Sequence, residues 1–196
     1  MPDAVATLAG ADADLAAVVD RIGTPPLWGR PPGFATLVRI ILGQQVSLGS
    51  ADAAYRRLQA TVGRVCPGSV AAAAESRLRR AGLTRQKAAY CRNLAIAVTS
   101  GGLSLKTVAT LDDAAARAQL VRVPGIGPWT ADIYLLMALR RPDIWPDGDL
   151  ALIKAAQRVK RLRQPPDSAT LRTLASAWSP WRAVAARVLW HEYLSW

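Results

Sequence analysis

A glycine-bearing turn between two apolar stretches has the clearest potential for chemistry in this chain. The turn runs from Val123 to Gly127 (VPGIG), and a helix is expected to open at Pro128. Gly125 and Gly127 allow positive φ and leave the backbone uncovered. The first N–H groups of a helix point outward at its positive end, so this place would bind an anion. In a basic chain the expected anion is a DNA phosphate.

The order of landmarks around this turn resembles the helix-hairpin-helix (HhH-GPD) DNA glycosylases. After the hairpin come, in order, Thr130, Ala131, Pro146, Asp149 and the apolar-basic run Leu150–Lys154. The resemblance covers roughly Phe34 to Trp196. It implies an all-α, two-lobed fold with a DNA-binding cleft between the lobes. It also implies one glycosylase module over residues 1–196, with the helix-hairpin-helix at about 112–140.

Asp149 matches the family's catalytic carboxylate, because it directly precedes the run LALIK. Breaking a base–sugar bond leaves positive charge on the sugar, and a carboxylate near C1′ stabilises that charge or guides an attacking water. An Asp at a helix start also serves as an N-cap, and both roles are compatible. Asp147 is a second candidate two residues earlier, whereas Asp132 is expected to be structural or a contact between the lobes.

Two tryptophans occupy positions that the resemblance places in a base pocket. Trp129 stands where bifunctional members of the family carry a Schiff-base Lys, so strand cleavage is not expected. Trp190 matches the last Trp of the WSPWR…W ending that resembles the alkylation-repair members. An electron-rich aromatic pocket favours cationic bases. The alternative for each Trp is a place in the core.

The resemblance also assigns DNA contacts, to Gly125, Gly127, Thr130, Gln44 and Gln45. The two glutamines lie in the segment ILGQQVS, which resembles a loop that enters the minor groove and fills the gap left by a flipped base. Gln45 matches the wedge position, and Gln44 is its minor-groove or structural neighbour. The alternative is that both glutamines cap or cross-link helices.

Cofactor expectations follow from the same resemblance. A structural Na⁺ or K⁺ on the backbone carbonyls of Val121, Val123 and Ile126 is implied, with no metal held by side chains. The chain has only two cysteines and one histidine, so no iron–sulfur cluster is expected. The form is expected to be compact, without the N-terminal β domain of two-domain relatives, and Trp28 is a candidate for the pocket contacts such a domain supplies.

The charge balance indicates the class of partner. Lys and Arg number 25 against 14 Asp and Glu, a net charge of +11. Such an excess favours nucleic acid first and an anionic membrane surface second, although an Arg-rich codon preference would also produce it. Arg85 and Lys87 are further phosphate candidates, or part of a solvated basic face. No apolar run spans a bilayer and no signal peptide is recognised, so a cytoplasmic, nucleoid-associated monomer is expected.

Helical periodicity occurs throughout, and strand patterns are almost absent. The expected helices include 12–22, a helical face over 34–42, 47–62, one after Leu83, 112–122, 128–139, 149–161, 167–178 and 181–194. The helix opened by Pro128 is apolar nearly all round and should be buried.

Together these features predict a monofunctional DNA N-glycosylase of base-excision repair. It would flip alkylated, cationic purines (3-methyladenine and 7-methylguanine) out of double-stranded DNA containing damaged bases. The alternatives are a non-catalytic helix-hairpin-helix DNA-binding protein and a glycosylase for deaminated or mismatched bases.

Overall fold

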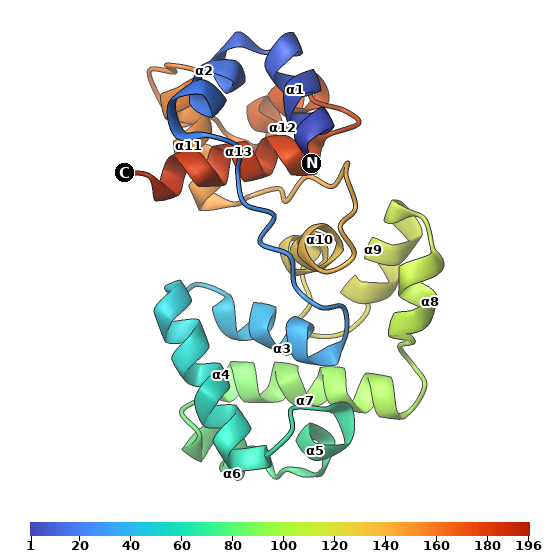
Figure 1. Cartoon of the computed structure of the whole chain (residues 1–196). Coiled ribbons are helices and arrows are strands. Elements are labelled where there is room, and N and C mark those ends of the chain that lie inside the picture. The colour runs from blue at the N-terminus through green and yellow to red at the C-terminus, as the bar shows by residue number, and fades with distance from the viewer. The chain divides into compact units, whose positions relative to one another are not determined.

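The computed structural model describes all 196 residues and contains helices without strands, which confirms the all-α prediction. The chain divides into two compact units (Figure 1). Met1–Gly29 and Arg140–Trp196 form the terminal unit, and Arg30–Leu139 forms the hairpin unit. Both ends of the chain therefore pack in one unit. None of the helices combines the length and the apolar character that crossing a bilayer would require.

The terminal unit is built around its last helix. Its helices are α1 (Pro2–Ala11), α2 (Ala13–Ile22), α11 (Leu150–Val159), α12 (Ser168–Ser176) and α13 (Arg182–Leu194). Every residue of α13 from Ala183 to Trp190 is buried, because α1, α2, α11 and α12 all contact this helix (Figure 1). A helix covered on every side can fix the direction of the side chains that it carries.

One buried ionic network joins the ends of the chain in this unit. Asp12 caps α2 and accepts hydrogen bonds from the N–H groups of Asp14 and Leu15. The same carboxylate accepts from Lys160 Nζ at 2.6 and 2.7 Å and from Trp178 Nε1 at 2.8 Å. Burial alone would raise the pKa of Asp12, but these hydrogen bonds outweigh it, so the pKa is lowered.

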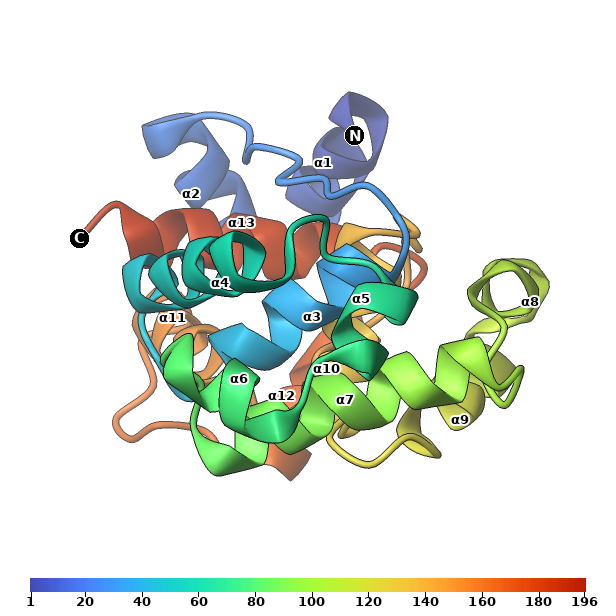
Figure 2. The ribbon, with the colours of Figure 1, turned by 90° about the horizontal axis from the view of Figure 1, so that it is seen from below.

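The hairpin unit contains the other eight helices. They are α3 (Phe34–Gly43), α4 (Leu48–Val62), α5 (Pro67–Ala72), α6 (Glu75–Arg80), α7 (Arg85–Thr99), α8 (Leu105–Thr110), α9 (Asp113–Val121) and α10 (Pro128–Met137). The apolar helix α3 contacts α4, α7 and α10 and lies at the centre of this unit (Figure 2). α10 is buried from Thr130 to Leu136, as its all-round apolar pattern predicts.

Aspartates mark the beginnings of several helices, as the sequence indicates. Asp112, Asp149 and Asp167 are the N-caps of α9, α11 and α12, and each accepts a hydrogen bond from a first-turn N–H. The helices α1, α5, α6 and α8 were not predicted. Three of them have only six residues, which is too short to show a periodic apolar face.

Candidate functional site

The two glycines of the hairpin have different conformations and surroundings. Gly125 has φ +103°, and a Cβ added there would lie 2.3–2.6 Å from Cβ, Cγ and Cδ1 of Tyr90. Gly127 is the N-cap of α10 with φ −82°, and a Cβ there would meet nothing within 4 Å. Gly125 therefore shapes the turn against α7, whereas the surroundings of Gly127 are open on its Cβ side.

Gln44, at the end of α3, braces the hairpin from inside the unit. Its Nε2 donates to the Gly125 carbonyl at 3.0 Å and to Thr130 Oγ1 at 2.9 Å. Thr130 is only 2% exposed. The Thr130 hydroxyl therefore lies in the interior with Gln44, and a DNA contact of Thr130 stays a prediction. For Gln44 these bonds favour the structural alternative over a minor-groove contact.

Gln45 lies next to this brace but has a different environment. It is exposed and adopts φ +57°, in the left-handed region that few residues other than glycine occupy. Such a conformation costs on the order of 1–3 kcal/mol and is concentrated at functional sites. Val46 and Leu48, on the same turn, are 46% and 73% exposed. The wedge role of Gln45 stays a prediction.

Helix α7 supports both the hairpin and the glutamine turn. Lys87 Nζ donates to the Leu42 carbonyl at 2.7 Å, and burial lowers the pKa of this ammonium. Lys87 therefore bonds to the backbone at the end of α3, and its phosphate contact stays a prediction. Tyr90, one turn later, packs under Gly125. Sequence reasoning missed Tyr90, because no spacing rule links a helical tyrosine to a glycine 35 residues away.

Asp149 and Trp190 are brought together in the terminal unit. Asp149 is half-buried at the start of α11, and its Oδ1 accepts the Leu152 N–H at 3.0 Å. The same oxygen accepts the indole N–H of Trp190, on α13, at 3.2 Å. Trp190 is 8% exposed. The helix start and the indole therefore fix the position of one carboxylate oxygen, which suits a group that must face developing positive charge.

Asp147, the competing carboxylate, is engaged differently. It forms an ion pair with Arg172 of α12, and its Oδ1 accepts the N–H of Gly148 at 3.1 Å. A guanidinium on this carboxylate offsets the negative charge that a positively charged sugar would need. This geometry favours Asp149 as the reactive group.

Trp129 belongs to the hairpin unit, where it is half-buried in the first turn of α10. The expected site residues are thus divided between the two units. Trp129, the glycines and the glutamines lie in the hairpin unit, and Asp149 and Trp190 lie in the terminal unit. Asp132, which was expected to be structural, is 2% exposed and accepts Arg117 Nε at 2.6 Å.

The connector before α3 carries a second aromatic group close to α13. Trp28 has φ +44°, and its ring lies edge-on to His191, with centroids 6.2 Å apart. Arg187, which sequence reasoning missed, is 3% exposed and donates to the Leu27 carbonyl, so it anchors this connector. Burial and the charge of Arg140 lower the pKa of Arg187 to about 10. The pocket role of Trp28 remains a prediction.

The hairpin carbonyls partly fit the expected monovalent cation. The Val123 carbonyl accepts the Ile126 N–H at 3.0 Å, which leaves one lone pair of this oxygen for a cation. The Gly125 carbonyl is already directed to Gln44. No group of three or more His, Cys, Asp or Glu side chains could hold a metal ion. The cation stays a prediction.

Comparisons with known proteins identify the family of this chain. Residues 38–180 match the HhH-GPD superfamily of base excision DNA repair proteins. A probable bifunctional transcriptional activator/DNA repair enzyme AlkA of Mycobacterium tuberculosis is 32% identical over 96% of this chain and 39% of its own length. The chain spans between 39% and 65% of the length of the curated relatives that it matches first.

Solved structures share the fold over nearly the whole chain. The DNA-3-methyladenine glycosidase of Bacillus halodurans is 28% identical, with a TM-score of 0.81 over 95% of this chain and 87% of its own. The 3-methyladenine DNA glycosylase of Schizosaccharomyces pombe, in complex with abasic DNA, has a TM-score of 0.86 at 23% identity and covers 96% and 95% of the two chains. The chain therefore belongs to the HhH-GPD superfamily of base excision DNA repair proteins.

Proposed function

We propose that this chain is the catalytic module of a monofunctional DNA glycosylase that removes alkylated, cationic purines from duplex DNA. The observation that carries the proposal is the Asp149 carboxylate, which is fixed by the Leu152 N–H and by the Trp190 indole at 3.0 and 3.2 Å. A non-catalytic DNA-binding protein would need no such pair. The family membership and the repair functions named for similar proteins support the same activity.

The chemistry proposed for Asp149 is electrostatic. A purine alkylated to a cation, such as 3-methyladenine or 7-methylguanine, leaves the sugar as a neutral molecule, so no general acid is needed to protonate it. The sugar becomes oxocarbenium-like, and the Asp149 carboxylate stabilises that charge or guides water to C1′. Flipping the base out of the stack is required before the carboxylate reaches the sugar. The Trp190 indole keeps an aromatic surface beside the carboxylate.

The absence of strand cleavage is proposed from the residue at the Schiff-base position. Trp129 has no amine, and a covalent imine requires one. Two of the four lysines are engaged elsewhere, since Lys160 is bonded to Asp12 and Asp14 and Lys87 to the Leu42 carbonyl. The product is then an abasic site in an unbroken strand. Trapping of a protein–DNA adduct with borohydride would contradict this part of the proposal.

The first turn of α10 would hold DNA by a phosphate of the DNA backbone. This helix begins directly after Gly127, whose Cβ side is open. Its first-turn N–H groups lie at the positive end of the helix dipole, where they would donate hydrogen bonds to a phosphate. A contact of this kind reads no base sequence.

The direct test is the release of bases from methylated duplex DNA, followed by chromatography. We expect 3-methyladenine and 7-methylguanine to appear, and Asp149→Asn to abolish their release. Single-turnover rates then define the substrate class. Faster release of hypoxanthine or of a mismatched pyrimidine than of 3-methyladenine would replace the cationic-purine proposal with the deaminated-base alternative.

A further inference from the structure

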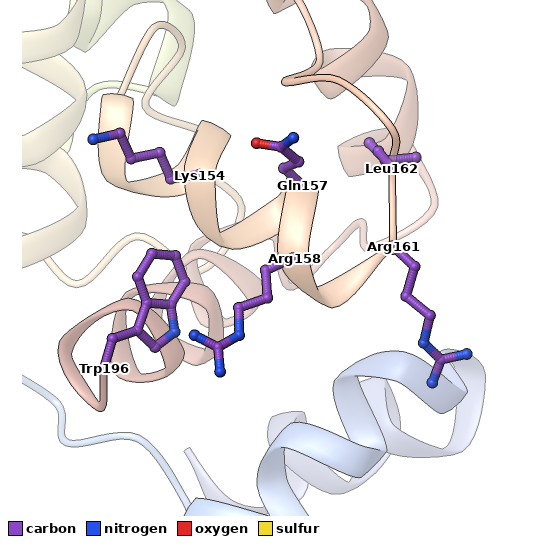
Figure 3. A pocket seen from close by; sticks show the side chains of 6 residues that line it. All are labelled: Lys154, Gln157, Arg158, Arg161, Leu162 and Trp196. Atoms are coloured by element: carbon purple, nitrogen blue, oxygen red, sulfur yellow. The ribbon is translucent and has the colours of Figure 1, made fainter.

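A basic groove lies on the terminal unit beside α11 and outside the residues assigned above. Its volume is about 530 Å³, and the residues that line it are Lys154, Gln157, Arg158, Arg161, Leu162 and Trp196. Figure 3 shows Lys154, Gln157 and Arg158 extending from one helix, with Trp196 beside Arg158 and Arg161 at the far end. No part of the glycosylase chemistry proposed above uses these side chains.

The cations of the groove come from α11 and from the turn that follows this helix. Lys154 and Arg158 stand at i and i+4 of α11, which places them on one face of the helix. Arg161 comes after the last helical residue, Val159, and has φ +52°. The groove therefore presents cations from two successive parts of the chain to a phosphate backbone.

The groove keeps its positive charge because few acids face it. Glu192 is 2% exposed and is shared by two guanidinium groups, those of Arg21 and of Arg158, the latter at 3.6 Å. Lys154 and Arg161 form no ion pair. One buried carboxylate cannot offset the cations of the groove and its rim, so the groove attracts a polyanion.

Trp196 adds an aromatic surface to this charge. It is 52% exposed, and its indole N–H donates to Glu192 Oε1 at 3.4 Å. The guanidinium carbon of Arg158 lies 4.9 Å from the ring centroid, and Tyr193 meets the ring edge-on, also at 4.9 Å. The indole is thus contacted from two sides, while about half of the residue stays exposed. An exposed aromatic ring among cations is the arrangement that binds unpaired nucleotides, by stacking and by phosphate contacts.

We propose that the basic groove binds a short unpaired stretch of DNA strand. Phosphates lie on Lys154, Arg158 and Arg161, and one base stacks on Trp196. Asp149 is the N-cap of α11, and Lys154 lies within this helix. The groove and the carboxylate proposed to act on the sugar therefore share one helix. The binding claim rests on the groove alone, and only its meaning for repair rests on the proposed function.

The experiment measures the binding of the whole protein to a labelled, undamaged oligothymidylate and to an undamaged duplex of equal length. We expect Trp196→Ala to weaken single-strand binding at least about fivefold, with a smaller effect on the duplex. Trp196→Phe should restore most of the affinity, because it keeps a stacking ring. Leu194→Ala, which removes another exposed side chain from the end of α13, is the matched control and should change nothing.

A charge variant tests the phosphate contacts independently. Lys154→Gln/Arg161→Gln should reduce the slope of log affinity against log salt by about 1.4 for the single strand, or 0.7 per phosphate. Lys106→Gln/Arg64→Gln, which removes the same charges from exposed positions of the hairpin unit, should leave that slope unchanged.

Several results would overturn the groove proposal. The first is that Trp196→Ala binds single-stranded DNA as tightly as the unchanged protein. The second is that its affinity falls equally for single-stranded and duplex DNA. The third is that the groove variants lose binding to phosphatidylserine vesicles but keep their binding to DNA. Failure of the glycosylase proposal is distinct, because it appears as no base release from methylated duplex whether or not the groove binds DNA.

Discussion

The hairpin unit and the terminal unit hold their candidate residues in contrasting ways. In the hairpin unit the proposed functional surface is the backbone, and side chains such as Gln44 and Tyr90 contact it from inside the unit. In the terminal unit the proposed functional group is the side chain of Asp149, which accepts hydrogen bonds from the Leu152 N–H and the Trp190 indole. The first arrangement suits recognition of a repeating phosphate, and the second suits one chemical step.

This contrast explains why some expected DNA contacts are internal. A backbone anion site depends on the conformation of its turn, so the polar residues near it serve as braces. Thr130 and Lys87 are examples, since their polar atoms bond to Gln44 and to the Leu42 carbonyl. Substitutions in the hairpin unit should therefore change stability and affinity together. Substitution of Asp149 should change the rate while affinity is kept.

The largest expected effect is on catalysis by Asp149→Asn. The amide can still accept from Leu152 and is a good N-cap, so stability should change little. It carries no negative charge, so base release should fall about a hundredfold or more, with DNA affinity largely kept. Single-turnover release and binding isotherms measure the two quantities. A variant that retains more than about a tenth of the rate, a loss under about 1.4 kcal/mol, would exclude Asp149 as the catalytic carboxylate.

The two hairpin glycines provide a matched pair of substitutions. Gly125→Ala places a Cβ against Tyr90 and strains a positive φ, so unfolding should become easier by about 1–3 kcal/mol. Binding to all DNA sequences should weaken alike, because the turn itself is distorted. Gly127→Ala meets no atom and should leave the melting temperature nearly unchanged. Equal losses of stability in both variants, measured by thermal denaturation, would contradict these separate roles.

Substitutions of the two neighbouring glutamines distinguish the structural role of Gln44 from the predicted wedge role of Gln45. Gln44→Ala removes two hydrogen bonds to the hairpin and should cost about 1–2 kcal/mol of stability. Gln45→Gly should be neutral or slightly stabilising, since glycine accepts φ +57° without strain. If Gln45 is the wedge, this variant should nevertheless slow base release. Urea denaturation with parallel rate measurements separates the two roles, and destabilisation by Gln45→Gly would argue against the strain.

The smallest expected effect is a pH dependence confined to the terminal unit. The pKa of Asp12 is lowered in the folded chain, so its contribution to stability is present above about pH 3.9 and is lost as the pH falls toward the folded pKa. The pKa of Lys160 is raised, so its contribution is present below about pH 10.4 and is lost above it. Asp12→Asn should flatten the acid side of a stability–pH curve followed by tryptophan fluorescence. A curve as steep as that of the unchanged protein would mean that other carboxylates dominate.

Much of the fold could be predicted from periodicity and capping. Asp12, Ser47, Asp112, Asp149 and Asp167 each begin a helix where the sequence indicates, because the cap and the apolar spacing are local properties. The helices α5, α6 and α8 pack against neighbouring helices, but they are too short to show an apolar pattern of their own. Helix α1 buries three apolar residues, Ala4, Val5 and Leu8. Local start signals such as the N-cap Ser104 of α8 are present, but these elements show no periodic apolar face that would identify them as helices.

The residue pattern was sufficient for the all-α class, because helical periodicity depends on neighbours in the chain. The helix-hairpin-helix and the choice of Asp149 came from the resemblance to a family, and the role of Asp149 stays a prediction. The tertiary structure decided which polar side chains face inward. Gln44 reaches Thr130 across 86 positions, and Trp190 reaches Asp149 across 41. Contacts at such separations arise only when helices pack, and no local pattern encodes them. The residue type of Trp129 likewise predicts that this position forms no imine, because the side chain has no amine, but it does not predict where the ring lies.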